Sequence, residues 1–170
     1  MTLAEQSTVI LEAINDQLLQ PEDVVRWADS AIVATEEPPR WLLELSALNS
    51  PHMQDYLSRL REHAQGRVSI RGQIEVIVLA HNSGLLTFGD TLSLLFRVAI
   101  TEREGRELDS VGERLEGALI SWDCQEDLDV IESALRSKFE AIFLEVLRDA
   151  REIAAVLPWK WRAEPVAAPG

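Results

Sequence analysis

Apolar side chains recur at every third or fourth position along most of this chain, which is the spacing of one face of an α-helix. The longest uninterrupted stripe runs from Leu128 to Leu157, and Pro158 follows it. This stripe predicts one C-terminal helix of about thirty residues, because each step keeps the apolar side chains on one side. Its members are Leu128, Ile131, Leu135, Phe139, Ile142, Val146, Ala150, Ile153 and Leu157.

Shorter stripes, separated by proline, glycine and polar residues, predict the remaining helices. We therefore predict the all-α fold class, a compact helical bundle of about seven or eight helices, with helical hairpins as candidate building blocks and a long C-terminal helix. A single helical domain is expected over residues 1–157, followed by a flexible C-terminal tail over residues 158–170. The shorter helices are expected over residues 3–19, 21–32, 40–48, 51–65, 68–83, 88–104 and 108–122.

Residues 74–79, which read Ile-Glu-Val-Ile-Val-Leu, are the ambiguous part of this pattern. A short β-branched run is compatible with a buried strand as well as with a helix. A helix over residues 68–83 is favoured, because Gly84 is placed as a helix terminator and the chain has no second strand-like segment for pairing.

A weak internal similarity lies at an offset of 67 residues. In both copies it straddles a predicted joint between two helices, so it indicates either two related helical hairpins or a chance match. The matched pairs are Ala13 with Ala80, Asn15 with Asn82, Leu18 with Leu85, Leu19 with Leu86, and Asp23 with Asp90.

Composition adds limits to this picture. Hydrophobic residues make up 46% and charged residues 26% of the 170, a mixture typical of a globular protein. One cysteine, Cys124, and three histidines argue against a disulfide framework and a structural zinc site, and they favour a reducing compartment.

The N-terminal residues lack the pattern of a signal peptide, and no apolar run is long enough to span a bilayer. A cytoplasmic protein with no membrane association is expected.

The net charge of −13 changes the expected class of partner. It disfavours binding to nucleic acid and to anionic membranes, so a charged partner is expected to be basic. Residues 1–50 carry nine acids and two bases, and residues 101–150 carry fourteen and six. The basic residues Arg59, Arg61, Arg67 and Arg71 are expected to neutralise acids of the chain itself.

Motifs for phosphate binding, acyl transfer and zinc hydrolysis are absent from the sequence. We therefore predict a non-enzymatic protein and assign no catalytic, cofactor-binding or metal-binding residue. The acids around Asp127 suggest a cation site by their oxygen ligands, but they lack the glycine and spacing of a calcium loop. A solvated start of the last helix, where acids compensate the helix dipole, is therefore the favoured interpretation of these residues.

Two acidic groups and three tryptophans near predicted element ends are the candidates for a recognition surface, since tryptophan anchors many interfaces. We predict an acidic interaction module that binds a basic partner protein, similar in size and charge to bacterial immunity proteins that inhibit basic toxins. The alternatives are a ligand-binding or enzymatic bundle with a pocket near His81, and a structural subunit that forms a homodimer through the C-terminal helix. The candidate partner-binding residues are Glu36, Glu37, Trp41, Asp123, Glu126, Asp127, Asp129, Trp159 and Trp161.

Overall fold

The structure, a computed structural model, describes residues 1–101, 109–123 and 128–158, and within these it leaves aside the side chains of residues 100, 101, 122, 123 and 128–135. Over these residues the chain forms nine α-helices and one π-helix and contains no strand, which confirms the predicted all-α class. The chain divides into two compact units. Unit 1 comprises residues 1–67 together with the chain from Ala154 onward, and unit 2 comprises residues 68–153.

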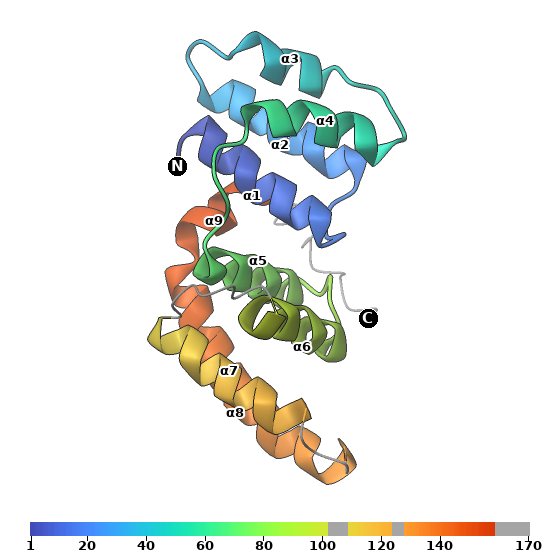
Figure 1. Ribbon diagram of the computed structural model, residues 1–170. Coiled ribbons are helices and arrows are strands. Elements are labelled where there is room, and N and C mark those ends of the chain that lie inside the picture. The colour runs from blue at the N-terminus through green and yellow to red at the C-terminus, as the bar shows by residue number, and fades with distance from the viewer. Residues whose placement is uncertain (102–108, 124–127, 159–170) are drawn as a thin grey trace, which may run out of the picture. The chain divides into compact units, whose positions relative to one another are not determined.

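Unit 1 contains helices α1 (Leu3–Asn15), α2 (Pro21–Ala34), α3 (Arg40–Ser46) and α4 (Met53–His63). Helix α1 packs on α4, and α2 packs on α3 (Figure 1). Thr2 and Glu5 form a capping box at the start of α1, and Pro21 occupies the first turn of α2, where its missing N–H costs nothing. The apolar faces bury Ile10, Ala13, Val24, Trp27, Ala28, Leu42, Leu45, Tyr56 and Leu60.

Unit 2 contains α5 (Ile70–Asn82), α6 (Phe88–Phe96), the π-helix η1 (Arg97–Thr101), α7 (Ser110–Asp123) and α8 (Leu128–Asp149). Helix α5 packs on both α6 and α8, and α7 with α8 forms a helical hairpin (Figure 1). The helix α5 resolves the ambiguity of residues 74–79 in favour of the predicted helix. Ile74, Ile77, Leu92, Leu95, Val98, Leu115, Leu119, Phe139, Ile142 and Val146 form the core of this unit.

The single C-terminal helix of about thirty residues is not confirmed. Helix α8 ends at Asp149, and a separate helix α9 (Arg151–Val156) follows after Ala150. The N–H of Ala150 still donates to the carbonyl of Val146 at 2.9 Å. Neither proline nor glycine stands near this point, so the apolar stripe continues through the break and the sequence pattern does not reveal it.

Several other predicted boundaries differ from the observed ones by a few residues, among them those of α1 and α4. Helix α1 ends at Asn15 instead of residue 19, because Gln17 takes a positive φ of 59° and the Leu18 N–H turns back to the carbonyl of Ala13. Helix α4 begins at Met53 and not at residue 51.

The predicted single domain over residues 1–157 stays a prediction, because only an unfolding experiment tells whether the two units unfold together. Residues 159–170 of the expected tail lie outside the described residues. In the part of the chain that the structure describes, none of the helices combines the length and the hydropathy that a bilayer span requires.

Candidate functional site

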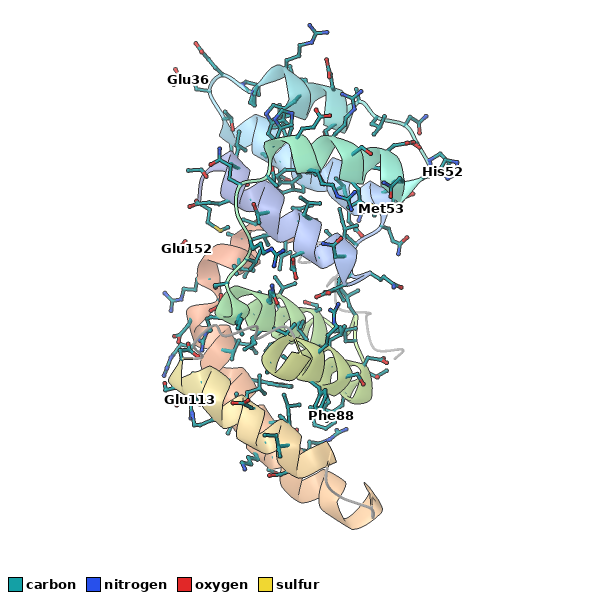
Figure 2. The ribbon with its side chains drawn as sticks, viewed as in Figure 1. Glu36, His52, Met53, Phe88, Glu113 and Glu152 are labelled. Carbon is teal, nitrogen blue, oxygen red and sulfur yellow. The ribbon has the colours of Figure 1, made fainter. Side chains whose placement is uncertain are left out.

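The loop between α2 and α3 carries the first pair of candidate residues, Glu36 and Glu37. Two prolines, Pro38 and Pro39, follow them and end any helical continuation from α2. Both glutamates are exposed, and neither takes part in a hydrogen bond or ion pair with the residues that the structure describes. Figure 2 shows the Glu36 side chain directed away from the helices. The loop therefore presents two carboxylates that are available to another molecule.

Trp41, in the first turn of α3, is held between two other rings of unit 1. Its ring stacks on His63 with 4.4 Å between centroids and 15° between planes. The ring of Trp27 lies 6.5 Å away, and its indole N–H donates to Gln6 Oε1 at 3.3 Å. Trp27 is buried, whereas Trp41 and His63 are partly exposed. Trp41 is thus a positioned aromatic side chain with one part open to solvent.

The basic residues of this part of unit 1 are engaged by acids of the same unit. Arg40 and Arg59 both pair with Glu44, at 2.7 and 2.8 Å, and Arg26 pairs with Asp23 at 3.7 Å. The hydrogen bond from Arg40 lowers the pKa of Glu44 below its ordinary value. The exposed pairs with Glu44 add little stability, and the three pairs together engage the only two bases among the first fifty residues.

Partly exposed apolar side chains lie on the same two helices. Val33, near the end of α2, is 89% exposed, and Leu43 of α3 is 45% exposed.

The other candidate residues are less fully described. Asp123 is the last residue of α7 and Asp129 is the second residue of α8, but their side chains are not among those described. Glu126, Asp127, Trp159 and Trp161 lie outside the described residues. Only Glu36, Glu37 and Trp41 can therefore be compared with the prediction, and the structure places all three in the segment from the end of α2 to the start of α3.

His81, the centre of the predicted alternative pocket, is a partly buried residue near the end of α5. Its Nδ1 lies 3.3 Å from the carbonyl oxygen of Leu86 and 3.1 Å from Thr91 Oγ1. Because Thr91 donates its own proton to the Thr87 carbonyl at 2.7 Å, both contacts require a proton on His81 Nδ1. His81 therefore donates to Leu86, in the turn before α6, and to Thr91 of α6, and these hydrogen bonds connect α5 with α6.

Aromatic rings surround His81 inside unit 2. Phe143 of α8 meets it edge-on at 5.4 Å, and Phe88 lies 6.0 Å away. The guanidinium of Arg136 lies 4.7 Å from the centre of the Phe88 ring (Figure 2 labels Phe88). These contacts join α5, α6 and α8, and they give His81 a packing role in addition to its hydrogen bonds.

The sequence pattern did not predict the central place of Arg71 in a cluster of carboxylates. Its side chain is only 20% exposed and contacts three carboxylates: Glu75 at 2.9 Å, and Asp109 and Asp149 both at 3.2 Å. The expectation that the basic stretch neutralises the chain's own acids is confirmed for Arg59 and Arg71. The sequence shows the charge of Arg71. It does not show that α5, Asp109 and Asp149, which are far apart along the chain, come together around this side chain.

The described residues contain no group of three or more histidine, cysteine, aspartate or glutamate side chains that could hold a metal ion. The arrangement thus defines an all-α protein of two helical units with an acidic and aromatic surface on unit 1. Comparison with protein-family models, with curated proteins and with solved structures gives no match for the chain.

Proposed function

We propose that this chain is a non-enzymatic interaction protein that binds a basic partner protein through Glu36, Glu37 and Trp41. The observation that carries the proposal is the α2–α3 loop, where two exposed carboxylates without partners in the described chain precede a partly exposed tryptophan. Carboxylates draw a basic partner and speed its association, while a tryptophan held in place supplies the buried contact at the centre of an interface.

The charge balance of unit 1 supports the same partner class. Both bases among residues 1–50 are paired with acids of the same unit, so they do not neutralise Glu36 and Glu37. A neutralising inhibitor of a basic protein, such as an immunity protein against a toxin, is the role that fits this surface. A cytoplasmic location belongs to the same proposal.

The experiment is a native pull-down of the tagged full chain from its source at low and at high salt. The captured protein is then purified and its affinity for the chain is measured. The double variant E36K/E37K reverses the two loop charges, and E113K/E140K is the matched control, since Glu113 and Glu140 are exposed on unit 2. We expect a basic protein that binds the wild-type chain and the control, is released by salt, and binds E36K/E37K at least about tenfold more weakly.

Equal weakening by both double variants would mean that net charge alone attracts the partner, and it would contradict the assignment to this loop. An unchanged affinity of E36K/E37K would contradict it as well. Circular dichroism of both variants checks that the helices are intact, which is expected because all four positions are exposed.

A second candidate function is self-association through α8. Leu144 on this helix is 69% exposed, the largest exposure of a large hydrophobic side chain in unit 2 among the described residues. Light scattering of the purified chain, run beside the pull-down, decides between this candidate and the first. A dimer mass at micromolar concentration supports self-association, and a monomer mass excludes it.

A further inference from the structure

The internal similarity at an offset of 67 residues extends beyond the five identical pairs around the joints between helices. When residue n is compared with residue n + 67, eight of the eighteen positions from 6 to 23 are identical to those from 73 to 90. The three additional identities lie on the first helix of each unit. They are Gln6 with Gln73, Val9 with Val76, and Ile10 with Ile77.

The helix boundaries follow the same offset. Helix α1 covers residues 3–15 and α5 covers 70–82, and α2 and α6 begin at residues 21 and 88. The N-cap residues correspond too: Thr2 accepts a hydrogen bond from the N–H of Glu5, and Ser69 accepts one from Gly72. Sequence identity and helix boundaries thus give the same register.

The joints between these helices have the same backbone geometry. Gln17 has a φ of 59° and Gly84 a φ of 73°, so the left-handed residue stands at the same position in each unit. The next residue turns its N–H back to the helix in both, from Leu18 to Ala13 at 2.8 Å and from Leu85 to Ala80 at 3.0 Å. A left-handed residue followed by this six-to-one hydrogen bond is a specific way to end a helix.

The first helix of each unit also packs on a later helix, but outside the register of the internal similarity. Helix α1 packs on α4, and α5 packs on α8. In unit 1, Thr8 donates to the carbonyl of Gln65, just after α4, at 3.1 Å. In unit 2, Arg71 pairs with Asp149 at the end of α8, and Arg71 corresponds to Ala4 and not to Thr8. The similarity is therefore assigned to the first two helices of each unit alone.

We infer that residues 2–24 and 69–91 are two copies of one helix–joint–helix segment, and that the copy in unit 2 carries a polar pair at a joint that does not require it. Positions 14 and 24 of unit 1 hold Ile14 and Val24, whereas the corresponding positions of unit 2 hold His81 and Thr91. Ile14 and Val24 are both buried, so at these two positions unit 1 carries apolar side chains where unit 2 carries the polar pair.

The hydrogen bonds of His81 are, on this inference, not required for the backbone of the joint. The hydrogen bonds of His81 to Leu86 and Thr91 have no counterpart at Ile14, although the backbone of the joint is the same. The pair His81 and Thr91 is therefore a specialisation of unit 2, and the protein should fold without it.

The test places the unit 1 residues in unit 2 of the full chain, as the double variant H81I/T91V. We expect an unchanged far-ultraviolet circular dichroism spectrum and a midpoint of thermal unfolding within about 4 °C of the wild type. The control H81A/T91A removes side-chain volume at the same positions and should lower the midpoint by more than about 6 °C. If H81I/T91V loses as much as the alanine control, the two joints are not equivalent and the inference is overturned.

Discussion

The two units build the same joint from different side chains. At the end of its first helix, unit 1 uses Ile14 and a strained Gln17, while unit 2 uses His81 and Gly84. The positions identical in both joints are the alanine that accepts the returning hydrogen bond, the asparagine two residues later, and the two leucines that follow the left-handed residue. The same joint backbone is therefore compatible with different residues at the positions between them.

One pair of identical residues has different surroundings in the two units. Gln6 accepts the indole N–H of Trp27, whereas unit 2 carries Leu94 at the position that corresponds to Trp27. Gln73 is 3% exposed, and its Oε1 finds no hydrogen-bond partner in the described part of the chain. The same side chain is thus satisfied in unit 1 and partly unsatisfied in unit 2, because leucine at position 94 offers no donor in place of the tryptophan indole.

The largest expected effect is the loss of stability when a core isoleucine is truncated at corresponding positions of the two units. Ile10 and Ile77 are corresponding, fully buried residues, so Ile10→Ala and Ile77→Ala should each lower the free energy of unfolding by about 2–5 kcal/mol. Urea unfolding of both variants measures this. A loss at one position without a comparable loss at the other would show that the two helices are not equivalent in packing.

An intermediate effect, unequal in the two units, should follow from replacing the corresponding glutamines. Gln6→Leu leaves the buried indole N–H of Trp27 without its acceptor and should cost about 1–3 kcal/mol. Gln73→Leu removes an unsatisfied buried acceptor together with the long 3.4 Å bond from Gln73 Nε2 to the Val68 carbonyl, so it should cost less, at most about 1 kcal/mol. Urea unfolding midpoints at one pH compare the two variants. Equal losses in both would contradict the distinction drawn between the units.

The smallest effect concerns the first turn of each unit and depends on pH. Hydrogen bonds from the backbone N–H and the hydroxyl of Thr2 lower the pKa of Glu5, so its carboxylate stabilises α1 above the ordinary pKa of a glutamate. This stabilisation is lost as the pH falls through the lowered value. Unit 2 has Gly72 at the corresponding position and no such carboxylate.

Glu5→Gln should therefore be less stable than the wild type at pH 7, and the difference should vanish under acid conditions. Denaturant unfolding of both proteins between about pH 7 and pH 3 measures the difference. A constant difference across this range would show that the Glu5 carboxylate does not stabilise α1 through its charge.

The candidate surface was only partly accessible to sequence reasoning. Acidic charge and proline breaks identified Glu36 and Glu37, because charge and helix breaking are local properties of the residues. The support behind Trp41 was not predictable, since His63 stands at the end of another helix and nothing in its neighbourhood indicates a ring partner. The same holds for Arg71, whose three carboxylates come from segments up to 78 residues away.

The sequence by itself determined the helical class, most helix positions and the register of the internal similarity, because periodicity, caps and breakers act within a few residues. Tertiary structure decided where α8 ends, although the apolar stripe runs on past Ala150. It also decided that Gln17 takes a left-handed conformation without being glycine, and that one of two identical glutamines keeps its partner. These outcomes depend on contacts between side chains that are far apart in the sequence. The pattern of apolar and polar residues along the chain does not specify those contacts.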